Sequence, residues 1–180
     1  QRNRNDRGPL MRWIAANRTT AMLRARGYEI VRYPTGYVFT DQFAADRVCQ
    51  PHFINELTDN WLGGSWLGSV MIGSWCSPLA RHVRRIEAIF RTLPQTCASQ
   101  GPRYVYAHVQ GPHPPFFFDA DGLRKDMPAA YTISDGSHLV QPGGTMTAAD
   151  YRAAYLGQLR YLSRRTQTML ADLLARTTRP

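Results

Sequence analysis

The sequence predicts an α/β fold in which helices pack on a small sheet. Two short segments, 28–33 and 104–107, are rich in strand-forming residues, and three longer ones repeat apolar residues at helical spacing. The segments alternate as helix, strand, helix, strand, helix, an order typical of α/β proteins. The chain has 180 residues, of which 43% are hydrophobic, so we expect a single unit, 1–180, with its own core.

The first helix and strand form one unit, 10–34. Pro9 stands at an early helical position, where its missing N–H is not needed. Gly27 fits the C-terminal cap of this helix, and the strand 28–33 follows directly. The polar residues 1–8 are predicted to be frayed.

The second helix is predicted for 79–93 and is preceded by a stretch of mixed character. That stretch has an apolar patch at 37–39 and a short helical pattern at 52–58. In 79–93 arginines take one face, Pro94 ends the helix, and the apolar face consists of Val83, Ile86, Ile89, Phe90 and Leu93.

The last helix has the strongest pattern and begins with an approximate capping box from Thr147 to Asp150. Before it, 123–146 is rich in proline and glycine and is predicted to be a long irregular loop of the kind that covers sites or binds partners. We expect one side of the helix to pack on the sheet, namely Tyr151, Ala154, Tyr155, Leu159, Leu162, Met169, Leu170, Leu173 and Leu174. Two strands are too few to bury three helices, which indicates part of a larger domain.

The strand 104–107 runs into two histidines set among prolines, at the place where α/β folds bind ligands. His113 has a proline on each side, so its backbone is extended and its ring is presented from a stiff loop. We therefore predict His113 as the first substrate-binding residue and His108 as the second. The alternative for His108 is a core histidine bonded to backbone. The whole motif is Tyr104-Val-Tyr-Ala-His108-Val-Gln-Gly-Pro-His113-Pro-Pro-Phe116-Phe-Phe-Asp119-Ala-Asp121-Gly122.

Two parts of this motif have other interpretations. The three phenylalanines 116–118 are predicted to be core or pocket wall. The segment 119–122 begins like a calcium-binding EF-hand loop, but the later acidic ligand is missing, so a polar turn is favoured.

The motif resembles sulfatase-like members of the alkaline phosphatase superfamily, particularly bacterial membrane-anchored proteins with an extracytoplasmic sulfatase-like domain. The flanking segments 23–34 and 155–162 resemble the helix–strand unit before the motif and the helix after it. The resemblance implies a partial alkaline-phosphatase/sulfatase-like sandwich, with His113 contacting the oxygens or the leaving group of a sulfate or phosphate ester. It also implies an extracytoplasmic location, periplasmic or on the outer face, and a substrate that is lipid- or glycan-linked.

The resemblance also implies catalytic parts that this sequence does not show. Such enzymes have an upstream acidic metal ligand, a nucleophilic Ser, Thr or modified Cys, and a downstream Asp-His-Gly motif. No catalytic residue, cofactor site or metal ligand is assignable here, so a divalent metal (Zn, Mn, Ca or Mg) is expected only in the intact parent. We expect an internal fragment that is inactive alone.

The charge favours an oxyanion partner. The chain has a formal net charge of +9, almost entirely from arginine, whose donor fork suits sulfate and phosphate. The densest clusters, 81–85 and 164–165, lie in predicted helices that need a polar face, and a solvated surface is their simpler explanation. They lack interleaved aromatics, so nucleic acid is not expected. The alternative function is a non-catalytic basic domain that binds anionic lipid, glycan or nucleic acid.

Two further features leave alternatives open. Cys49, Cys76 and Cys97 form no metal-binding pattern, and buried free thiols are preferred to one disulfide. The uncharged segment 61–77 is too rich in glycine and serine for a membrane span. Its tryptophans permit a loop at a membrane interface, and core packing is the alternative.

Overall fold

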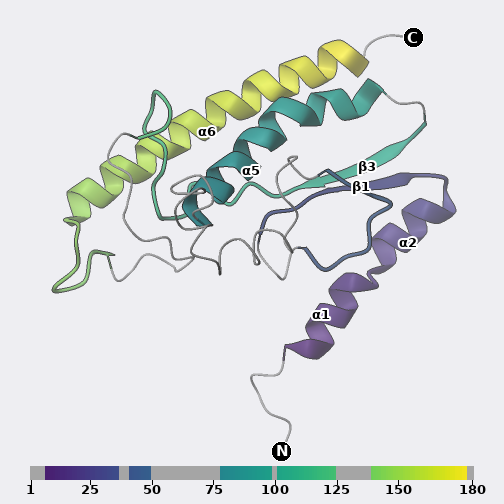
Figure 1. Cartoon of the computed structure of the whole chain (residues 1–180), viewed down its shortest axis with the longest axis horizontal. Helices are drawn as coiled ribbons and strands as arrows, with labels where there is room; N and C mark the ends of the chain where they lie inside the picture. Colours follow the sequence, from purple (N-terminus) through teal and green to yellow (C-terminus); the bar gives the residue numbers. More distant parts are fainter. Residues whose placement is uncertain (1–6, 37–40, 50–77, 99–100, 125–138, 178–180) are drawn as a thin grey trace, which may run out of the picture.

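The computed structural model describes residues 7–36, 41–49, 78–98, 101–124 and 139–177. In Figure 1, helices α5 and α6 run side by side on one side of the strands, and α1 and α2 lie on the other. The elements are α1 (Gly8–Ala15), α2 (Arg18–Ala25), β1 (Glu29–Tyr33), β2 (Arg47–Val48), α5 (Pro78–Thr92), the 3-10 helix η2 (Leu93–Ala98), β3 (Arg103–Ala107) and α6 (Ala148–Thr177).

The three strands form a parallel sheet in the order β2-β1-β3. Val31 of β1 is opposite Arg47 on one side and Val105 on the other. The predicted α/β class and both predicted strands are therefore confirmed. β2 was not predicted, because two residues are too few to give an alternating pattern.

The predicted first helix is wrong in one respect, because it is two helices. Asn17 breaks it: its Oδ1 accepts a hydrogen bond from Thr20 N at 2.9 Å and caps the start of α2. The predicted cap at Gly27 is confirmed. This glycine has φ +80°, and the N–H groups of Gly27 and Tyr28 donate to the carbonyls of Arg24 and Leu23, as in a Schellman motif. Gly8 already belongs to α1, so the predicted frayed segment does not extend to that residue.

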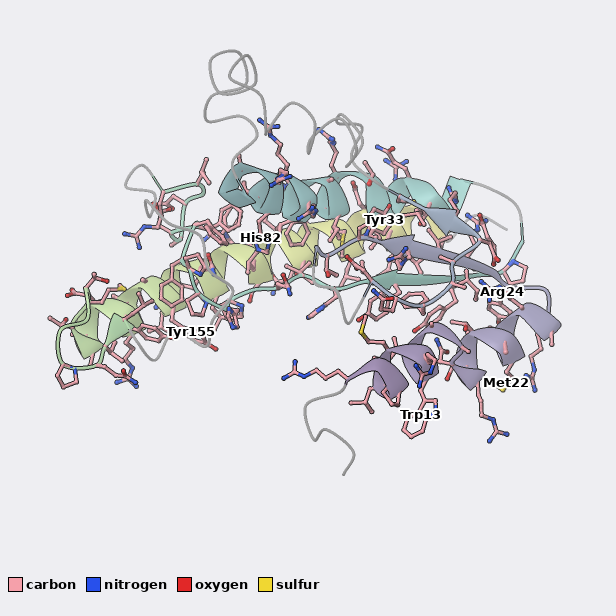
Figure 2. All side chains as sticks on the ribbon, turned by 60° about the horizontal axis from the view of Figure 1, so that its bottom comes forward. Trp13, Met22, Arg24, Tyr33, His82 and Tyr155 are labelled. Carbon is pink, nitrogen blue, oxygen red and sulfur yellow. The ribbon has the colours of Figure 1, made fainter. Side chains whose placement is uncertain are left out.

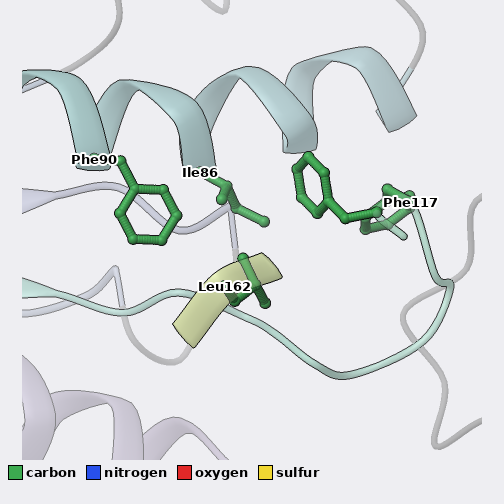
Figure 3. Packing of buried hydrophobic residues seen from close by; sticks show 5 residues of the cluster. Ile86, Phe90, Phe117 and Leu162 are labelled. Carbon is green, nitrogen blue, oxygen red and sulfur yellow. The ribbon is translucent and has the colours of Figure 1, made fainter. Parts of the chain in front are cut away.

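The core lies between the sheet and the α5–α6 pair. Val31 and Tyr33 of β1 pack against Ile89 of α5. A second cluster joins α5, α6 and the segment after β3, as Figure 3 shows, and consists of Ile86, Phe90, Phe117, Phe118 and Leu162. The predictions of the second helix and of a core position for the phenylalanines are confirmed.

The predicted apolar side of α6 is only partly correct. Only Gln158 and Leu162 are fully buried, whereas Tyr155, Leu170 and Leu174 are exposed. Met169 reaches both core clusters. The helix begins as predicted, because Asp150 N donates to Thr147 Oγ1 at 3.1 Å.

Several predictions fall on other parts of the chain. The patch 37–39, the pattern 52–58 and the segment 61–77 lie outside the described residues, as does 125–138 of the predicted loop. The described end of that loop consists of turns, with Gly144 N donating to Gln141 O. Cys49 is a half-buried free thiol. Within the described ranges, no helix has the length and apolar character needed to cross a membrane.

Candidate functional site

The motif after β3, which we call the motif loop (108–122), lies beyond the carboxyl end of a parallel strand. His108 and His113 are both exposed. Among the described residues, His108 makes no hydrogen bond, so the alternative of a buried histidine bonded to backbone is wrong. The peptide bonds before Pro112 and Pro115 are cis.

The ring of His113 is held by its own loop. Its Nδ1 lies 2.5 Å from the carbonyl oxygen of Pro114. A carbonyl only accepts, so Nδ1 must carry the proton of this hydrogen bond, and the Nε2 atom of the neutral ring is then the acceptor. The exposed Nε2 can therefore accept a proton, or donate one when the ring is charged.

Gln158 of α6 fixes the motif loop from behind. Its Nε2 donates to His113 O at 3.1 Å, and its Oε1 accepts from Phe117 N at 2.8 Å and Phe118 N at 3.2 Å. The side chain is only 1% exposed. The sequence-based prediction missed Gln158, because its partners are backbone groups about forty residues away.

His82 of α5 is a second buried polar residue beside the motif loop that the sequence-based prediction missed. It is 4% exposed, and its ring centroid lies 5.1 Å from that of Phe117. Burial, followed by the charges of Arg85 and His113, lowers the pKa of His82 from 6.5 to about 4. The ring is therefore neutral at pH 7. Its position four residues before Ile86, on the apolar side of α5, is the pattern that could have identified it.

Arg85 extends from α5 to the end of the neighbouring strand β1. Its guanidinium packs on Gly36: a Cβ added there would collide with it, 2.9 Å from Cζ. Gly36 has φ +80°, and its N–H donates to Asp41 Oδ2 at 2.9 Å. Asp41 Oδ1 also accepts from Thr35 N at 2.9 Å. No carboxylate in the described part of the chain pairs with Arg85.

The two segments that these residues belong to or contact lie at one end of the sheet. β1 and β3 are adjacent and parallel, with Tyr33 opposite Ala107, so the 35–36 segment and the motif loop leave the sheet at the same end. His82 is near enough to Arg85 and to His113 for the charge of each to lower its pKa. His82 of α5 thus packs on Phe117 of the loop that carries the predicted site residue His113, and Arg85 of the same helix packs on Gly36 after β1. The structure gives His108 no contact with His82 or Arg85.

The other parts of the motif serve the fold. Asp119 Oδ1 accepts from Asp121 N at 2.8 Å and Gly122 N at 2.9 Å, which is the predicted polar turn. Arg164 Nη2 donates to Ala120 O in the same turn. Arg165 Nη2 lies 2.6 Å from Glu87 Oε2 and ties α6 to α5. Arg164 is exposed, as expected for a solvated face, and the half-buried Arg165 also links the two helices.

The described residues do not form a metal centre. Among them, no group of three His, Cys, Asp or Glu side chains could hold an ion. The carboxylate of Asp41 already accepts hydrogen bonds from the backbone N–H groups of residues 35 and 36. Comparisons with protein-family models, with curated proteins and with solved structures found no match to this chain.

Proposed function

We propose that this chain is part of a sulfatase-like domain of the alkaline phosphatase superfamily, whose parent hydrolyses or transfers a sulfate or phosphate ester. We assign to Arg85 and His113 the role of binding the ester oxygens. The observation that supports this role is that the segment 35–36, on which Arg85 packs, and the motif loop, which carries His113, leave two adjacent parallel strands at the same end. The motif resemblance supports the superfamily, its sandwich fold and an extracytoplasmic, membrane-anchored parent.

The chemistry follows from the charges. A tetrahedral ester develops negative charge on its oxygens and leaving group as it reacts. The guanidinium of Arg85, without a carboxylate partner in the described part of the chain, offers a fixed donor fork to these oxygens. His113 donates through Nε2 when protonated, while Nδ1 keeps its bond to Pro114 O. His82 stays neutral at pH 7, so it adds no positive charge near Arg85 and His113.

The proposal assigns no step to a metal. A divalent ion, Zn, Mn, Ca or Mg, is part of the superfamily chemistry, but the described residues do not fit one. Metal ligands and nucleophile would come from residues other than the described ones, which would supply a wall of the oxyanion site.

The first test is a titration of the chain with inorganic sulfate and phosphate, followed by NMR of the His113 ring. We expect saturable binding that weakens at least roughly fivefold in Arg85→Gln and His113→Ala, because each removes one charge-assisted hydrogen bond. The exposed Arg91→Gln and His108→Ala are matched controls that should bind like the wild type. If Arg85→Gln and His113→Ala bound the anions as tightly as the wild type, the proposed site would be wrong.

A second test separates a catalytic parent from a binding domain. A longer product of the parent gene would be assayed for sulfate- and phosphate-ester turnover with each divalent ion, with and without His113→Ala. Turnover reduced by the substitution supports the proposal. Saturable anion binding without turnover in a folded, metal-loaded protein would instead favour the non-catalytic basic domain.

A further inference from the structure

Three apolar side chains on α1 and α2 point away from the rest of the protein. Trp13 is 72% exposed, Leu10 52% and Met22 49%. Figure 2 shows Trp13 and Met22 on the side of these helices that faces away from the strands. We call these three residues the outer face. No residue of α1 is buried, so this helix contributes little to the core.

The charge around the outer face is of one sign. Residues 7–28 contain five arginines and no Asp or Glu. Arg24 pairs with Asp46 at 2.9 Å, but Arg12 and Arg18 are exposed, and no carboxylate in the described residues pairs with either. By contrast, Arg47 and Arg165 form ion pairs within the fold. The outer face therefore combines exposed apolar groups with unneutralised positive charge.

We propose that the outer face binds the surface of an anionic lipid bilayer, with α1 lying in the plane of the interface. Tryptophan favours this region, and arginine stems extend over apolar surface while the guanidinium reaches the headgroups. A helix of 8 residues is far too short to span the membrane, but its apolar side can enter the headgroup boundary. The positive charge selects an anionic surface.

This inference is independent of the proposed oxyanion site. The outer face lies on the opposite side of the sheet from α5, which carries Arg85 and His82. Substitutions in the outer face should therefore leave anion binding at the oxyanion site unchanged, and substitutions in that site should leave vesicle binding unchanged. Nothing in the outer face forms the row of aromatics that nucleic acid would need for base stacking.

The test is co-sedimentation of the full chain with vesicles of phosphatidylcholine alone, or with phosphatidylglycerol added. We expect binding to the anionic vesicles only. Trp13→Ser should lower partitioning several-fold, whereas Leu174→Ser, at a 61% exposed position on α6, should leave it unchanged. Loss of Arg12 and Arg18 charge in a double Gln variant should weaken binding by roughly fivefold for each arginine. The control double variant is Arg152→Gln with Arg160→Gln, both exposed on α6.

Three outcomes would overturn the inference. They are equal binding to neutral vesicles, no binding to either kind, and binding that Trp13→Ser and Leu174→Ser weaken alike. Far-UV circular dichroism of each variant checks the fold. Trp13→Ser should not change it, because the side chain of Trp13 is exposed. Retention on an acidic protein or on RNA with no vesicle binding would likewise reject a lipid partner.

Discussion

The side-chain amide of Gln158, on α6, donates to the backbone carbonyl of His113 at 3.1 Å. The histidine with the exposed ring is thus held from behind by a buried residue of a distant helix. The same amide accepts from Phe117 N and Phe118 N, so one side chain holds both ends of the 113–118 segment. The loop that presents His113 depends on α6 for its position.

The first prediction concerns this amide. Gln158→Leu keeps the approximate volume but leaves two N–H groups and one carbonyl without their partner. An unsatisfied buried polar group costs about 1–3 kcal/mol, so we expect the free energy of unfolding to fall by about 2–4 kcal/mol. Urea denaturation followed by circular dichroism measures it.

Gln95→Leu is the matched control for this substitution. Gln95 is exposed and makes a single 3.3 Å hydrogen bond to Arg91 O, so its replacement should change stability by less than about 0.5 kcal/mol. Equal effects at the two positions would mean that the Gln158 hydrogen bonds do not stabilise the fold.

The second prediction uses two glycines with the same backbone conformation. Gly27 and Gly36 both have φ +80°, but only at Gly36 would a Cβ meet another group, the guanidinium of Arg85. Each alanine variant should lose about 1 kcal/mol of stability, because alanine is strained at this φ. Arg85 is flexible and will move aside in Gly36→Ala. Sulfate binding should therefore weaken several-fold in Gly36→Ala and stay unchanged in Gly27→Ala.

Isothermal titration with sulfate measures this difference, and thermal unfolding checks the two stabilities. If both variants bound sulfate like the wild type, the contact between Gly36 and Arg85 would not position the guanidinium. If both lost binding, a general loosening of the fold would explain the effect.

Local patterns predicted the parts of the fold that depend on neighbours in sequence. The apolar repeat that ends at Pro94 gave α5, and the strand-forming residues gave β1 and β3. The break at Asn17 was missed, because apolar residues at helical spacing continue on both sides of it. The Asn17 side-chain cap marks the start of α2. β2 exists through pairing with β1 and has no pattern of its own.

The site was harder to predict for a related reason. His113 was found from its prolines, a local feature. Gln158 and His82 are polar residues buried by distant partners, so periodicity alone assigned them no role. His82 was grouped with the arginines beside it, although the apolar side of α5 includes its position. The role of a buried polar residue can be predicted only when the segment that packs against it is known.

The last prediction concerns pH and tests the buried state of His82. Its pKa is about 4 in the folded protein and about 6.5 when unfolded, so the unfolded chain binds more protons between these values. The stability contributed by the neutral ring is fully present above pH 6.5 and is lost as the pH falls toward 4. We expect urea denaturation to show about 2 kcal/mol less stability at about pH 4.5 than at pH 7 from this residue.

His82→Leu should remove that difference whatever its effect at pH 7, and His108→Gln, at an exposed position, should retain it. Asp46 does not interfere, because hydrogen bonding to Ile30 N lowers its pKa below 3.8, outside this range. A pH dependence that survives in His82→Leu would show that His82 is not the group that titrates.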